Sequence, residues 1–147
     1  MKSLFTWWQR WRKKKPIDTD LPIHLIRGQI GEEAAAKHLE EKGCQLLVRN
    51  YESKRGEVDL IIRDEGCLVF VEVKTRTGER WGRPASAIDK KKRRNLSMAA
   101  LDYLRAIGNP PVKIRFDVVE VLLTDRTVRE LRHLPNCFEM EPPFRYG

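Results

Sequence analysis

The stretch that decides the fold is GEVDLIIRDEGCLVFVEVKTR, residues 56–76. Two apolar runs flank the dipeptide Glu65-Gly66, a pattern that predicts two antiparallel strands joined by a tight turn. Side chains alternate between the faces of a strand, and both faces of the second run are largely apolar, as in a central strand of a sheet. Asp59, Glu72 and Lys74 nevertheless interrupt these runs. Charges at these positions of an apolar hairpin need an explanation.

The expected register of this hairpin places two acids opposite each other. If Glu65 and Gly66 form the turn, counting back along both strands puts Asp59 opposite Glu72; a four-residue turn gives the same register, and a three-residue turn does not. Two carboxylates about 5 Å apart between Cβ atoms are destabilising unless a cation or a proton lies between them. Lys74 shares a strand face with Glu72 and would supply part of that positive charge.

A helix predicted over residues 23–42 adds a third acid. Glu32, Ala35 and Leu39 recur at helical spacing, so Glu32 occupies a packing stripe, where a carboxylate needs a partner. Gly43 is suited to end this helix in a left-handed cap. Three acids converging with one lysine describe an oxygen-ligand site for Mg²⁺ or Mn²⁺, with the lysine near a bound water. The alternative is a cluster that neutralises itself at the solvated end of the strand.

The remaining pattern predicts a short strand at 44–48, a helix at 86–107, a strand at 112–123 and a weaker strand near 128–131. Ser86 and Asp89 fit a capping box at the start of the second helix, and Gly108 is expected to end it. The core stripe of that helix has apolar residues at helical spacing: Leu96, Ala99, Ala100, Tyr103, Leu104 and Ile107. This order predicts an α/β domain with a central mixed β-sheet flanked by helices.

The length of 147 residues suits one domain. We predict a basic, Trp-rich tail and linker at 1–22, the folded domain at 23–134 and a C-terminal tail at 135–147. No apolar run approaches the roughly 20 residues that a transmembrane helix requires. The three cysteines are scattered and form no CxxC pair, which argues against a disulfide framework or a zinc site and favours a reducing, cytoplasmic setting.

The net charge of +8 is concentrated at the N-terminus, where residues 1–15 contain Lys and Arg residues among four aromatic ones but no acid. Three interpretations of this tail stay open. It is a membrane-surface helix, a nucleic-acid arm that stacks on bases and neutralises phosphates, or a solvated terminus. Contact with a membrane surface or a protein partner through the tail is therefore one expectation.

Four ordered blocks together resemble the YraN family of small bacterial proteins, within the PD-(D/E)XK nuclease superfamily and similar to archaeal Holliday junction resolvases. The blocks are GQIGEEAAAKHL (28–39), GEVDLI (56–61), VFVEVKTR (69–76) and FDVVEV (116–121). The resemblance covers about residues 27–123, and four blocks in order are far more specific than an isolated D…ExK pattern. It implies the restriction-endonuclease-like fold.

The resemblance also implies an activity: a metal-dependent endonuclease, with Mg²⁺ or Mn²⁺, that hydrolyses phosphodiester bonds in DNA, with branched or junction DNA as one substrate class. In such folds Asp59 and Glu72 bind the metal and Glu32 completes its shell. Lys74 orients or activates the attacking water, although its ordinary pKa of about 10.4 makes a purely electrostatic role as suitable. The alternative is a non-catalytic nucleic-acid-binding module that keeps the nuclease fold.

Nucleic-acid contacts are expected from two adjoining segments. Lys90, Arg93 and Arg94 fall on neighbouring turns of the second helix and would grip phosphates, although a merely solvated helix start is the other interpretation. The segment before that helix adds charge and one stacking surface through Arg76, Arg80, Trp81 and Arg83. DNA is the expected partner, and a second copy of the chain, in a homodimer, is another.

Overall fold

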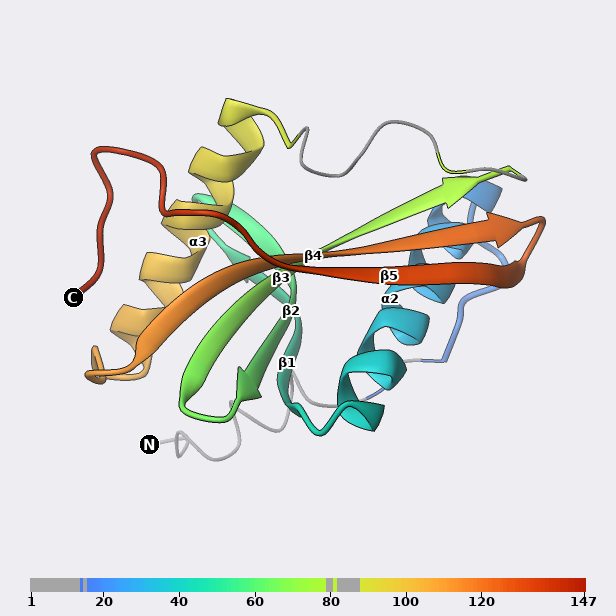
Figure 1. Ribbon diagram of the computed structural model, residues 1–147. Helices are drawn as coiled ribbons and strands as arrows, with labels where there is room; N and C mark the ends of the chain where they lie inside the picture. The colour runs from blue at the N-terminus through green and yellow to red at the C-terminus, as the bar shows by residue number, and fades with distance from the viewer. Residues whose placement is uncertain (1–13, 15, 79–80, 82–87) are drawn as a thin grey trace, which may run out of the picture.

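The computed structural model describes residues 14, 16–78, 81 and 88–147. In these residues a five-stranded sheet lies between two helices (Figure 1), α2 (Ile23–Glu41) and α3 (Lys90–Ala106). The strands are β1 (Gln45–Ser53), β2 (Gly56–Asp64), β3 (Cys67–Thr77), β4 (Lys113–Thr124) and β5 (Thr127–Phe138). No helix in these ranges is long and apolar enough to cross a membrane.

The strands lie in the sheet in the order in which they occur along the chain, β1-β2-β3-β4-β5. Neighbouring strands are antiparallel except β3 and β4, which are parallel and are connected through α3. A parallel pair needs such a crossover because its second strand must restart at the same edge as the first. The predicted α/β fold with a mixed sheet is confirmed, and it is compatible with the restriction-endonuclease-like fold.

The β2–β3 hairpin has the predicted register. Backbone pairing begins at Asp64 and Cys67, on either side of a two-residue turn, and continues without a shift along both strands. Continuing this register places Asp59 opposite Glu72, one step beyond the last backbone pair. These two acids therefore lie near the start of β2, at the point where β3 stops pairing with β2.

The two faces of the sheet carry separate cores. Aromatic side chains form much of the core between the sheet and α3. Tyr103 of α3 is in edge contact with Phe70 of β3, with 6.0 Å between the ring centroids. Against α2 packs an aliphatic core that includes Ala35, Leu39 and Val71. Because β3 contributes to both cores, its hydrophobic run is nearly continuous, as expected for a central strand.

Several element boundaries differ from the sequence prediction. Helix α3 begins at Lys90, and Asp89 is its N-cap, with Oδ1 accepting a hydrogen bond from the Lys92 backbone N–H at 2.8 Å. Asp89 is therefore the N-cap, whereas the sequence pattern predicts that it lies within a first turn that begins at Ser86, a residue outside the described ranges. Strand β1 is longer than predicted, and Gly43 has the expected positive φ of 92° after α2.

The C-terminal residues pack against the domain. Strand β5 extends to Phe138, so its last residues belong to the segment that was expected to be a tail. Beyond it, Met140 and Tyr146 pack against the core beside α3, and the chain passes along that helix (Figure 1). The alternatives for the N-terminal tail concern residues 1–15, nearly all of which lie outside the described ranges.

Candidate functional site

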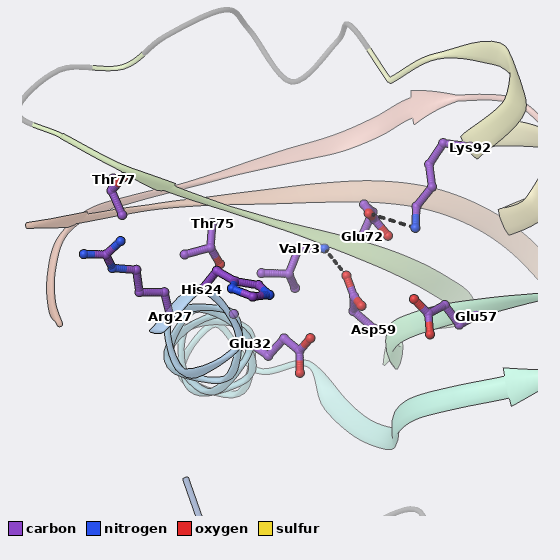
Figure 2. Close-up of a pocket in the computed structure, with 11 residues that line it drawn as sticks. His24, Arg27, Glu32, Glu57, Asp59, Glu72, Val73, Thr75, Thr77 and Lys92 are labelled. Atoms are coloured by element: carbon purple, nitrogen blue, oxygen red, sulfur yellow. Dashed lines mark hydrogen bonds and ion pairs between the residues drawn. The ribbon is translucent and has the colours of Figure 1, made fainter. Parts of the chain in front are cut away.

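A pocket of about 410 Å³ lies between the start of β2, the end of β3 and residues near the start of both helices (Figure 2). Four acidic side chains line it, Glu32, Glu57, Asp59 and Glu72. Three basic side chains line it as well, His24, Arg27 and Lys92. The structure thus brings together the three acids predicted from the sequence and adds residues that the sequence did not single out.

Asp59 and Glu72 form the centre of the pocket. Asp59 Oδ2 accepts a hydrogen bond from the Val73 backbone N–H at 2.8 Å, so the carboxylate takes a donor that lies beyond the last backbone pair of the hairpin. Glu72 is 8% exposed, and its Oε1 lies 3.3 Å from Lys92 Nζ. Its other oxygen, Oε2, is buried without a hydrogen-bond partner among the described residues. The Asp59 and Glu72 side chains lie close enough to share a proton, so either a proton or a cation can stand between them.

Burial and mutual repulsion shift the acids of the pocket. Burial raises the pKa of Asp59, and the hydrogen bond from Val73 only partly offsets this effect. Burial, and then the charge of Asp59, raise the pKa of Glu72 to about 8. Burial and the charge of Asp59 also raise the pKa of Glu32 to about 7. Such a cluster holds more negative charge than its surroundings compensate, a condition that occurs often at functional sites.

Lys92, like His24 and Arg27, was not predicted from the sequence, and it is the basic residue of the pocket that pairs with Glu72. It lies in the first turn of α3, and its ammonium reaches Glu72 across the pocket (Figure 2). Partial burial alone would lower the pKa of Lys92, but the charges of Glu72 and Asp59 outweigh that effect and raise it. If Asp89 had been taken as the N-cap, the sequence would have placed Lys92 in the first turn of α3. No sequence signal shows that this turn lies beside the acids.

Lys74, the predicted catalytic lysine, lies on the strand face of Glu72 but is not among the residues lining the pocket. In the parallel register of β3 and β4 it stands beside Glu120. Glu120 is fully buried and forms an ion pair with Arg132. The catalytic role of Lys74 stays a prediction.

The basic residues predicted to bind nucleic acid on α3 have structural partners. Arg93 donates hydrogen bonds to Glu141 at 3.0 Å and to the Ile88 carbonyl at 2.6 Å. The Arg94 guanidinium lies 5.2 Å from the centre of the Phe144 ring. Both arginines therefore contact the C-terminal segment, and Arg94 and Lys90 are exposed.

The segment before α3 is described only in part. Trp81 has Arg132 over its ring at 4.3 Å, and its indole N–H donates to Glu130. The predicted stacking surface thus already has a cation against one ring face. Arg76 Nε is buried without a partner among the described residues, and Arg80 and Arg83 lie outside them. Their roles toward nucleic acid stay predictions.

The acids suit a hard divalent cation held mostly by water and substrate. Within the described ranges, no group of three or more His, Cys, Asp or Glu side chains could hold a metal ion by itself. Mg²⁺ commonly uses only one or two carboxylates and completes its shell with water and phosphate oxygens. Asp59 and Glu72 could provide such a donor set, and Glu32 lines the same pocket.

Comparisons with known proteins agree with the motif pattern. The model of "Uncharacterised protein family UPF0102" matches residues 31–121. A UPF0102 protein of Pelotomaculum thermopropionicum is 44% identical over 114 residues, which cover 77% of this chain and 95% of the relative. One of Symbiobacterium thermophilum is 49% identical over 94 residues, 64% of this chain and 80% of the relative. One of Rhodococcus jostii is 39% identical over 115 residues, 78% of this chain and 98% of the relative. These names state a family and no activity.

Proposed function

Since this chain belongs to the uncharacterised protein family UPF0102, the YraN family of the PD-(D/E)XK nuclease superfamily, we propose that it is a metal-dependent endonuclease that hydrolyses phosphodiester bonds in DNA. The observation that carries the proposal is the pair Asp59 and Glu72, opposite each other at the open end of the hairpin with raised pKa values. A sheet gains no stability from two such acids, and a bound cation would account for their placement.

In the proposed site, Asp59 and Glu72 hold Mg²⁺ or Mn²⁺, and Glu32 supports the ion directly or through water. The bound ion would supply polarisation of a phosphate oxygen and a lowered pKa of water. The backbone N–H of Val73 holds the Asp59 carboxylate in place, so its orientation is set before any ligand arrives. A lysine, which is Lys74 in the family motif, would offset the negative charge that develops on the phosphate.

A second candidate is a nucleic-acid-binding module that keeps this fold without cleavage. The ion pair of Lys92 with Glu72 favours it, because an ammonium already neutralises part of the acid pair. Such a module would use the pocket as a charged surface, without hydrolysis.

The experiment that separates the two candidates incubates the purified chain with linear, flapped and four-way-junction DNA, with Mg²⁺, Mn²⁺ or a chelator. We expect metal-dependent cleavage of at least one substrate, loss of cleavage in Asp59→Asn, and unchanged cleavage in Glu40→Gln, an exposed acid on α2. Binding without cleavage by the parent chain supports the binding module. If the parent chain neither binds nor cleaves any of these DNAs, both candidates are overturned.

A further inference from the structure

The pocket contains a lysine for which neither the family motifs nor the relatives' names provide a role. Lys92 Nζ lies 3.3 Å from Glu72 Oε1, and Lys92 lines the pocket together with Asp59 and Glu32. We propose that Lys92, and not Lys74, is the catalytic lysine that contacts the nucleic-acid phosphate at the Asp59–Glu72 pair. This inference rests on the proposed nuclease function and assigns one more residue to it.

The position of Lys92 is set by the start of α3. Asp89 Oδ1 accepts the Lys92 backbone N–H at 2.8 Å, so the cap fixes the backbone from which this side chain extends. The side chain is 34% exposed, which leaves the ammonium accessible from the pocket while its stem lies against protein. The first turn of a helix also adds a partial positive charge that favours an approaching phosphate.

The Lys92 ammonium can exchange its contact with Glu72 for a contact with a phosphate oxygen. A lysine ammonium is a point charge on a flexible four-carbon stem, so it can leave one oxygen for another nearby without any backbone movement. With Glu72 as a ligand of a divalent cation, the Lys92 ammonium would be free to contact a phosphate bound beside it. The ammonium would then balance phosphate charge instead of carboxylate charge.

Lys74 has different surroundings from those of Lys92. The register of β3 and β4 sets it beside Glu120, whose side chain is fully buried and whose Oε1 has no hydrogen-bond partner among the described residues. A buried carboxylate requires positive charge nearby, and Arg132 contacts only its other oxygen. Among the described residues, Lys74 forms no ion pair with Glu120 or with an acid of the pocket, whereas Lys92 pairs with Glu72.

The test compares Lys92→Met, Lys74→Met and Lys91→Met, the last being an exposed lysine beside Lys92 on the same helix turn. Two quantities are measured for each variant: single-turnover cleavage of a DNA that the parent cleaves, and Mn²⁺ affinity by calorimetry without DNA. We expect Lys92→Met to slow cleavage by roughly 100-fold or more, as for loss of one transition-state charge contact. Its Mn²⁺ affinity should stay equal or become tighter, because the ammonium no longer competes for Glu72. Lys91→Met should match the parent in both measurements.

The outcomes distinguish this inference from the proposed function. Parent-like cleavage by Lys92→Met together with an inactive Lys74→Met overturns the inference and leaves the nuclease function standing. Weakened Mn²⁺ affinity in Lys92→Met also overturns it, since Lys92 would then merely support the carboxylates. A parent that cleaves no DNA overturns the function, and the catalytic role of Lys92 with it. If Lys92→Met does not fold, Lys92→Arg and Lys92→Gln take its place, and cleavage retained by Arg but not by Gln supports the inference.

Discussion

At the scale of single residues, the acid pair opposes the stability of the metal-free protein. Asp59 and Glu72 are largely removed from water, which raises the pKa of both, and the charge of Asp59 raises the pKa of Glu72 further. Protonation or a cation relieves this cost. A cation competes with that proton, and above the pKa of Glu72 its binding would neutralise charge that folding forces together and so stabilise the folded protein.

The first prediction is a pH-dependent stabilisation by Glu72→Gln. The pKa of Glu72 is raised from 4.5 to about 8 in the folded protein. Between these values the unfolded chain has released a proton that the folded protein still holds, so the free energy of unfolding falls as pH rises from about 4.5 to 8. Glutamine cannot ionise, so we expect the melting temperature of Glu72→Gln to be close to that of the parent at pH 5 and several degrees above it at pH 8. Each kcal/mol of unfolding free energy corresponds to roughly 2–8 °C in melting temperature.

Differential scanning calorimetry of the chelator-treated chain measures this change. Glu40→Gln, at an exposed position on the same protein, serves as the control and should shift the melting temperature equally at both pH values. The same shift at pH 5 and pH 8 for Glu72→Gln would contradict the pKa on which the prediction rests.

At the scale of elements, the approach of α2 to β3 places Glu32 at the pocket. A Cβ atom on Gly31 would lie 1.9 Å from Thr75 Oγ1 and 3.0 Å from Thr75 Cβ. Threonine is β-branched and stiff at χ1, so it cannot yield cheaply. The helix therefore reaches the end of β3 only because residue 31 has no side chain, and Glu32 follows it directly.

The second prediction compares two glycines of α2. We expect Gly31→Ala to lower the free energy of unfolding by about 1–3 kcal/mol through overpacking against Thr75. Gly28→Ala has open space at its added methyl group, and alanine favours a helix, so it should be neutral or stabilising by up to about 1 kcal/mol. Urea denaturation of both variants measures the difference. Equal stability of the two variants would show that α2 does not depend on this approach.

The third prediction concerns the cap of α3. Asp89→Ala removes the acceptor of the Lys92 backbone N–H and should cost about 0.5–2 kcal/mol of stability. It should also slow cleavage, by less than Lys92→Met does, because the lysine is loosened but still present. Asp89→Ser, which keeps a capping oxygen, is expected to restore both properties. A serine variant as impaired as alanine would argue against capping as the cause.

At the scale of the whole molecule, the C-terminal segment closes one side of the domain. Glu141 pairs with Arg93, and its backbone N–H donates to Ser97 Oγ at 2.9 Å. Met140 and Tyr146 pack beside them against the core under α3. The start of α3, and with it Lys92, is therefore braced by residues more than forty positions away in the sequence.

The fourth prediction is that deletion of residues 139–147 destabilises the protein. The deletion removes the apolar contacts of Met140 and Tyr146 and leaves Arg93 without its carboxylate partner. Full burial of one large apolar side chain is worth about 1.5–3 kcal/mol, and both side chains here are partly buried, so we expect a loss of a few kcal/mol. Urea denaturation measures it, with a chain lacking only Gly147 as control. A truncated chain as stable as the parent would mean that this segment only rests on the domain.

The sequence by itself determined the hairpin and its acids. Strand alternation and a two-residue turn are local, so the register that sets Asp59 opposite Glu72 follows from counting. The position of Glu32 on a packing stripe likewise follows from helical periodicity, and the structure places this residue in the same pocket. The family and the mixed sheet were predictable for the same reason, because their signals lie in short contiguous blocks.

Only the tertiary structure decided which lysine meets these acids. Charged residues from Lys90 to Arg94 spread around a helix axis, so their order alone does not say which one faces the sheet. The rotation of α3 is set by packing of Leu96 and Tyr103 into the core and by the crossover that joins two parallel strands. That packing turns Lys92 toward Glu72 and leaves Arg93 and Arg94 to the C-terminal segment. Contacts between residues far apart in the chain carry no local sequence signal, because they depend on how whole elements are placed.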